Sequence, residues 1–105
     1  MQVAVLGSGS RGNSILVAGG NTRVLVDAGF SAKAMETRLG LLGLLPEEIH
    51  AIVITHDHGD HTRGAGVFAR RHGTPVFLTD LTREACGSLF RGGEELHPYR
   101  AGFPF

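Results

Sequence analysis

Short apolar runs separated by polar or glycine-rich turns predict the strands of a β-sheet. The first run, at residues 3–6, ends in a glycine-rich loop. Two further runs, at 13–18 and 22–27, flank a Gly-Gly-Asn turn and predict a β-hairpin. A fourth, Ala-Ile-Val-Ile at 51–54, has no polar position, which is typical of a central strand buried on both faces. Residues 74–79 predict a further, parallel strand.

Helical patterns alternate with these strands. Ser31 is a suitable N-cap for a helix that runs to about residue 42, because its hydroxyl can accept a bond from the first helical turn. A second helix is expected over residues 62–72, with Val67 and Phe68 facing inward. Strands and helices therefore follow one another along the middle of the chain.

The last third of the chain continues this alternation. Asp80 or Thr82 should cap a helix that ends near residue 90, and residues 94–105 are expected to form a turn and the beginning of a strand pair. Strands and helices in this order predict an α/β fold with one mixed β-sheet and flanking helices.

The polar residues gather most densely directly after the fourth apolar run. Residues 55–61 contain three imidazoles and two carboxylates. His56 and His58 are two positions apart, so an extended backbone would point them to the same side. A glycine then allows a sharp turn, and Asp60 and His61 approach from another direction. Two differently aimed pairs of ligands suit two neighbouring metal ions better than one closed tetrahedral site.

The chemistry of this cluster narrows the choice of metal. Imidazole and carboxylate together favour zinc, manganese or iron over calcium or magnesium. The cluster lacks cysteine, which disfavours a structural zinc site made of thiolates. The alternative is a solvated loop, the usual place of an isolated Asp or His. The density of ligand-type residues behind an apolar strand favours the metal site.

Composition restricts the remaining possibilities. The chain has 105 residues, enough for one domain, with ten basic and ten acidic side chains. This balance lacks the basic surplus of a nucleic-acid or membrane binder, although bound metal ions can supply positive charge to a nucleic-acid substrate. A single cysteine, Cys86, rules out an internal disulfide, and no export segment or membrane-spanning apolar stretch is visible. We therefore expect a cytoplasmic protein.

The glycine-rich loop allows three interpretations. Residues 7–12 spell G-x-G-x-x-G after a predicted strand, which would make Asp27 the ribose ligand of a dinucleotide site. That motif requires a helix to begin within the loop, whereas a predicted hairpin follows, so the dinucleotide reading is disfavoured. A loop that contacts phosphate or lies near a metal, and a plain strand connector, both remain open. The residues concerned are Ser8, Ser10, Gly12, Asn13 and Ser14.

The motif His-x-His-x-Asp-His at 56–61 resembles the signature of the metallo-β-lactamase superfamily. The resemblance implies that His56 and His58 bind one metal ion while Asp60 and His61 bind a second, with Asp60 taking part in catalysis. The segments Ser-Gly-Ser-Arg-Gly-Asn-Ser and Leu-Val-Asp-Ala-Gly look like the YycJ-type branch of that superfamily, where the serine-glycine loop lies beside the metal centre.

Three further residues are expected to support the metal ligands from outside. By the same resemblance Asp27, which follows a strand, is a carboxylate that orients a ligand rather than a ligand itself, although it could also simply cap a turn. Thr55 and Asp57 are expected in the same outer layer.

The resemblance also implies a function. The superfamily hydrolyses substrates with metal-activated water, and the branch points to a phosphodiesterase, namely a DNA exonuclease acting on single-stranded or nicked DNA. A thioester or other ester hydrolase is the alternative enzyme, since fold alone does not decide among them.

The resemblance covers only the amino-terminal part of the family domain, an αββα sandwich. The downstream half would supply another histidine to each metal, a bridging acid and the second sheet, and no residue after His61 fits those roles; His97 is too isolated. We therefore expect weakly held metal ions and an open apolar sheet face through which the chain self-associates, unless it is a piece of a longer protein. A catalytically incomplete metal-binding fragment or interaction module is the alternative function.

Overall fold

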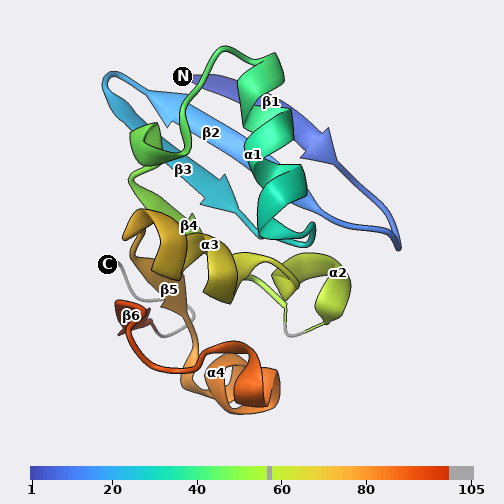
Figure 1. Cartoon of the computed structure of the whole chain (residues 1–105), viewed down its shortest axis with the longest axis vertical. Helices are drawn as coiled ribbons and strands as arrows, with labels where there is room; N and C mark the ends of the chain where they lie inside the picture. The colour runs from blue at the N-terminus through green and yellow to red at the C-terminus, as the bar shows by residue number, and fades with distance from the viewer. Residues whose placement is uncertain (57, 100–105) are drawn as a thin grey trace.

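One six-stranded mixed sheet organises the chain, and its strands lie in chain order (Figure 1). A computed structural model describes residues 1–56 and 58–99, and for Asp60 and Ser88 it describes the backbone only. The strands are β1 (Gln2–Gly7), β2 (Ser14–Gly19), β3 (Thr22–Val26), β4 (Ala51–Val53), β5 (Val76–Leu78) and β6 (Leu96–Pro98). Strands β1 to β3 pair antiparallel, and β3 to β6 pair parallel. The expected mixed sheet and hairpin are confirmed.

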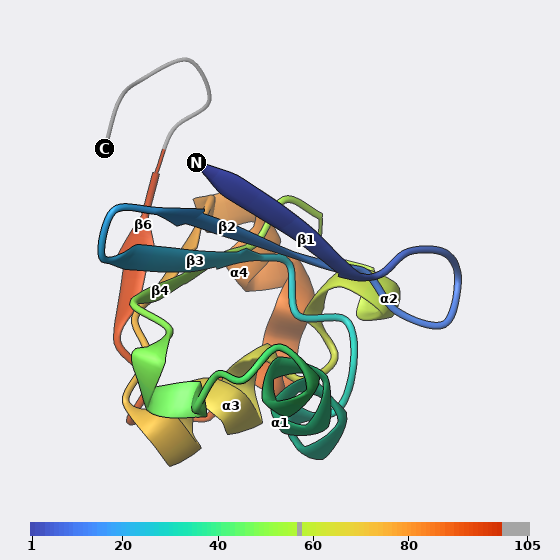
Figure 2. The ribbon, with the colours of Figure 1, turned by 90° about the horizontal axis from the view of Figure 1, so that it is seen from above.

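Helices α1 and α3 cover one face of this sheet (Figure 2). The helices are α1 (Ala32–Leu41), α2 (Gly59–Thr62), α3 (Ala65–His72) and α4 (Asp80–Cys86), with 3-10 turns η1 (Pro46–Glu48) and η2 (Gly87–Leu89). Apolar side chains from the sheet and these helices form the core, among them Leu25, Met35, Ile52 and Phe68, each fully buried. Ser31 caps α1 as predicted, since its Oγ accepts from the Ala34 N–H at 3.2 Å.

The predicted helix over residues 62–72 is wrong in its beginning. The chain forms the short α2 on the polar motif itself, breaks at Gly64, and starts α3 at Ala65. The chain passes close to the Phe30 carbonyl oxygen at this break. A Cβ on Gly64 would lie 2.0 Å from that oxygen, so the position requires glycine. Phe68 is buried as expected, but Val67 is 40% exposed.

The carboxyl-terminal elements also differ from expectation. Thr79, rather than Asp80 or Thr82, caps α4, because its Oγ1 accepts from the Thr82 N–H at 3.2 Å. In place of a strand pair, the described part of the segment contains β6, which is parallel to β5; residues 100–105 lie outside the described residues.

The second face of the sheet is apolar and largely uncovered. Strand β4 was expected to be buried on both faces, and Ile52 is fully buried, but Ala51 and Val53 are only half-buried. No described helix lies over this face around β1 to β3 (Figure 2). Val3 and Val5 at its edge are 61% and 63% exposed, so the expected open apolar face is present. No described helix has the length and apolar character needed to span a membrane.

Candidate metal centre

The candidate site lies at the carboxyl ends of the neighbouring parallel strands β3 and β4. Asp27 directly follows β3, whereas Thr55 and His56 follow β4. The two strand ends are joined, since the Asp27 N–H donates to the Val53 carbonyl at 2.7 Å. His61 lies on α2, whose backbone is joined to the segment after β3 by a 2.8 Å hydrogen bond from the Ala28 N–H to the His61 carbonyl. This is the edge of an α/β sheet at which ligands commonly bind.

Asp27 is the buried centre of the site. It is 5% exposed and has a φ of 66°, a left-handed backbone that Asp tolerates better than most residues. Its Oδ1 accepts from the Thr55 N–H at 2.7 Å. Its Oδ2 accepts from the Thr55 hydroxyl and contacts His61 Nδ1, each at 2.6 Å. Both carboxylate oxygens are therefore occupied by protein donors.

These contacts fix which nitrogen of each imidazole carries the proton. A carboxylate only accepts, so the Nδ1 of His61 donates to Asp27. The Thr55 hydroxyl donates its hydrogen to the Asp27 carboxylate. Its oxygen is therefore the acceptor in the 2.8 Å contact with the Nδ1 of His56. Both imidazoles thereby carry a proton on Nδ1, so Nε2 is the nitrogen through which either ring would bind a metal ion. Their ring centroids are 4.5 Å apart.

The donor set fits a divalent transition metal. Asp27, His56 and His61 each offer a ligand-type atom, and these atoms lie within 4.8 Å of one another. Because Asp27 already accepts three hydrogen bonds, it is better suited to orient the imidazoles than to bind the ion directly. A carboxylate holding a histidine whose other nitrogen faces the metal is the usual outer layer of such sites.

The other predicted ligands, His58 and Asp60, are not among the three grouped side chains. His58 is the exposed N-cap of α2, and its carbonyl accepts from the His61 N–H at 2.8 Å and the Thr62 hydroxyl at 3.0 Å. Its side chain is outside the group of three. The backbone of Asp60 lies in the first turn of α2, but its side chain, like the whole of Asp57, lies outside the described residues.

The glycine-serine loop is joined to the same site. The buried Ser14 hydroxyl donates to the Asp27 carbonyl at 2.7 Å, and the Gly29 N–H donates to the Asn13 carbonyl at 3.0 Å. The Asn13 side chain closes the loop by two bonds to the Gly9 backbone, at 3.0 and 2.7 Å. Figure 2 shows the loop beside α2. Asn13 and Ser14 therefore have a structural role here, whereas the hydroxyl-bearing residues left exposed are Ser8 and Ser10.

The ring of Phe30 packs against Gly7 and Gly12, at the two ends of the glycine-rich segment. A Cβ on Gly7 or Gly12 would lie 2.2 or 2.6 Å from its carbon atoms, so both positions need glycine for the ring to pack. The Arg38 guanidinium lies 3.9 Å from the ring centroid and donates to the Leu6 carbonyl at 2.6 Å. No pattern in the sequence indicates this clamp of Phe30 and Arg38, because its members meet only after α1 has packed on β1.

Tyr99 is a second residue that the sequence does not reveal. Its hydroxyl donates to the carbonyl of Ile54, the residue before Thr55, at 2.9 Å. Burial, and then the negative charge of Asp27, raise the pKa of Tyr99, so the hydroxyl remains a donor at neutral pH. It supports the metal motif from a position 45 residues further along the chain.

The chain is similar in sequence to known proteins. The Exodeoxyribonuclease WalJ of Streptococcus pneumoniae is 40% identical over 82 residues, which cover 78% of this chain and 30% of the relative. The Exodeoxyribonuclease YycJ of Bacillus anthracis is 39% identical over 89 residues, covering 85% of this chain and 34% of the relative. The chain thus spans about a third of the length of these relatives.

Solved structures share the fold. The metallo-β-lactamase fold protein YhfI of Bacillus subtilis superimposes with a TM-score of 0.72 at 20% identity, over 98% of this chain and 48% of that one. The Rm3 metallo-β-lactamase gives 0.74 at 22% identity, over 98% and 44%. The sequence model of the metallo-β-lactamase superfamily matches residues 7–102. The chain belongs to the metallo-β-lactamase superfamily.

Proposed function

We propose that the intact protein is a metal-dependent phosphodiesterase that degrades DNA as an exonuclease on single-stranded or nicked substrates. The observation that carries this proposal is the network from Asp27 through Thr55, which holds His56 and His61 by their Nδ1 atoms and brings the two imidazoles to one site. The names of the WalJ and YycJ relatives support DNA as the substrate.

His56 and His58 would hold one divalent ion, and Asp60 and His61 the other. When bound, such ions activate water and neutralise charge on a phosphodiester. Zinc, manganese and iron all suit this donor set.

The chain's own residues act by orientation and hydrogen bonding. Asp27 and Thr55 keep the two imidazoles in one tautomer and one rotation. The exposed hydroxyls of Ser8 and Ser10, on a loop fixed to the Asp27 segment, are available to donate to a phosphate oxygen.

The decisive experiment compares substrates under one set of conditions. The full-length protein is incubated with manganese and 5′-phosphorylated single-stranded DNA, nicked duplex DNA or a thioester. We expect release of nucleotides from DNA, and a loss of about a hundredfold or more when His56→Ala removes a ligand. His50→Ala, an exposed histidine before β4, is the matched control. Cleavage of the thioester alone would reject the nuclease proposal.

The second candidate is a metal-binding module without turnover. Among the described side chains, the site brings together three ligand-type groups. Catalytic sites usually offer three protein ligands to each metal ion, so three groups are too few for two ions. Metal analysis of the purified 105-residue chain tests the module proposal for this chain. One ion or none per chain supports the module, and two tightly bound ions contradict it.

A further inference from the structure

A cavity lies at the opposite end of the sheet from the candidate metal centre. Its volume is about 470 Å³, within the range of small-molecule sites. Strands β1 and β3 begin here and β2 ends here, whereas Asp27 follows the far end of β3. The chain segment after α1 forms the remaining wall. The lining residues are Gln2, Val3, Ala4, Leu16, Ala18, Arg23, Leu42 and Leu44.

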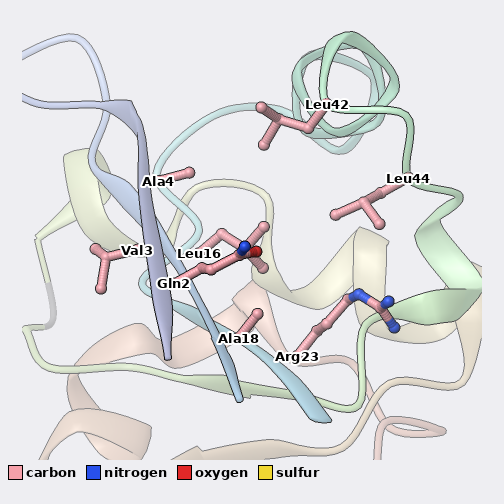
Figure 3. A pocket seen from close by; sticks show the side chains of 8 residues that line it. All are labelled: Gln2, Val3, Ala4, Leu16, Ala18, Arg23, Leu42 and Leu44. Atoms are coloured by element: carbon pink, nitrogen blue, oxygen red, sulfur yellow. The ribbon is translucent and has the colours of Figure 1, made fainter. Parts of the chain in front are cut away.

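The side chains around this cavity are aliphatic except at one end. Figure 3 shows Leu16, Ala18 and Arg23 pointing to the side of the sheet on which Leu44 lies, while Val3 points away. Arg23 is the one charged residue of the lining, and the Gln2 amide is the other polar side chain. The cavity therefore combines an apolar wall with a single positive charge.

Arg23 is a half-buried residue whose guanidinium is available to a ligand. Two other arginines differ in this respect, because Arg38 binds the Leu6 carbonyl and Arg71 binds the Glu36 carboxylate. For Arg23, no carboxylate or carbonyl among residues 1–56 and 58–99 pairs with the guanidinium, although its backbone N–H donates to His50 at 3.0 Å. Five N–H donors in a planar fork remain for an anion.

We propose that this cavity binds a small aliphatic carboxylic acid, with its carboxylate on Arg23 and its chain along Leu16, Ala18 and Leu44. A planar carboxylate matches the guanidinium fork, and an aliphatic chain matches the walls. A bare phosphate would leave the leucines uncovered. This site is separate from the proposed hydrolysis, so it does not depend on that function.

The mouth of the cavity carries apolar surface that such a ligand would reduce. Leu42 is 48% exposed, and its neighbour Leu41 is 83% exposed. Leu45, next to the lining residue Leu44, is 64% exposed. Leu42 thus contributes partly exposed apolar surface to the lining of the cavity.

The test titrates the isotope-labelled chain with octanoate and follows its backbone amide resonances. A ligand of about ten non-hydrogen atoms should bind saturably with roughly millimolar affinity. We expect the resonances of Ala18, Arg23 and Leu44 to move, while those of the metal motif stay unchanged. Octan-1-ol, which has the same chain without the charge, should bind about tenfold more weakly.

Two variants separate the parts of the proposal. Arg23→Gln should weaken octanoate by about tenfold or more and leave octan-1-ol unchanged, whereas Ala18→Leu should fill the cavity and weaken both. Arg83→Gln, an exposed arginine on α4, is the control, and circular dichroism verifies that each variant is folded. Absence of saturable octanoate binding, or equal binding by wild type and a folded Arg23→Gln variant, would overturn the proposal.

Discussion

Asp27 determines the geometry of the candidate site at the scale of single residues. Its left-handed backbone turns the carboxylate back over the end of β4, where it accepts bonds from Thr55 and His61. The same residue receives the Ser14 hydroxyl at its carbonyl, so it also anchors the loop. One buried acid thus couples the two imidazoles to the neighbouring loop.

Replacing Asp27 by asparagine should separate orientation from folding. Asparagine tolerates the left-handed conformation, but its NH₂ group accepts no hydrogen bond and so cannot replace a carboxylate oxygen that accepts from Thr55 or His61. We expect zinc affinity to fall about 10- to 100-fold with little change in the melting temperature. Competition against a chromophoric chelator measures the affinity, with the exposed Asp80→Asn as control. Unchanged zinc affinity would show that Asp27 does not orient the ligands.

Glu36 should make stability depend on pH. On α1 it accepts from His72 Nε2 at 2.6 Å and from the Arg71 guanidinium at 2.8 Å, both on α3. The hydrogen bond from His72, followed by that from Arg71, lowers the pKa of the Glu36 carboxyl. A lowered folded pKa means that this stabilisation is complete above the unfolded value of about 4.3 and is lost as pH falls through the folded value.

The measurement compares wild type with Glu36→Gln by thermal unfolding from pH 7 to pH 3. The wild type should melt higher at neutral pH, and the difference should shrink at the acidic end. Glu84→Gln, an exposed glutamate on α4, should show no such dependence. A difference that stays constant over this range would contradict the assignment.

At the scale of elements, the break between α2 and α3 places the metal motif. Gly64 allows the chain to pass against the Phe30 carbonyl, and its N–H donates to the Ala28 carbonyl at 2.9 Å. Gly64→Ala should therefore destabilise the fold by roughly 1–3 kcal/mol through overpacking. In contrast, Gly40 in α1 has open space where a Cβ would lie, and Gly40→Ala should stabilise by about 0.5–1 kcal/mol. Chemical denaturation of both variants gives the comparison; equal effects would refute it.

The clamp of Phe30 and Arg38 should keep the glycine-serine loop in one conformation. Arg38→Met removes the bond to the Leu6 carbonyl and the contact with the Phe30 ring. We expect faster hydrogen exchange at the Gly9 and Gly12 amides and, if DNA is the substrate, a raised KM with a smaller change in kcat. Lys33→Met, an exposed change on the same helix, is the control. Unaltered exchange in the loop would exclude the clamp.

Local patterns in the sequence predicted most of these elements. The Gly-Gly-Asn turn, the Ser31 cap and the apolar run at 51–54 each act through neighbouring residues, so the hairpin, α1 and β4 were predictable. The break at Gly64 and the support from Tyr99 were not, because each depends on a contact between distant segments. The motif at 56–61 predicted a metal site, which stays a prediction, whereas the hydrogen bonds that join Asp27, Thr55, His56 and His61 became visible only in the structure.

At the scale of the whole molecule, the sheet is asymmetric. Helices α1 and α3 pack on one face, whereas the other face presents a continuous row of paired apolar side chains from β1 to β5. The row consists of Val3, Val5, Ile15, Val17, Val24, Val26, Ala51, Val53 and Phe77. Such a surface is larger than the scattered apolar residues of ordinary monomers.

This face should make the isolated chain self-associate. We expect size-exclusion chromatography with light scattering to give a dimer or larger species at micromolar concentration. Val5→Lys, which places a charge on the row, should shift the population toward monomer. The control is Thr37→Lys on the opposite, helical side. A monodisperse wild-type monomer would count against self-association.

The strands lie in the sheet in the same order as in the chain, which affects how the sheet can form during protein synthesis. Each strand from β2 onward pairs with the one made just before it, so no ladder has to open to admit a later strand. The sheet can therefore grow in one direction as the chain leaves the ribosome, with the β1–β2–β3 meander forming first from local contacts. Asp27, at the end of β3, would then be positioned before the histidines of the motif at 56–61 are synthesised.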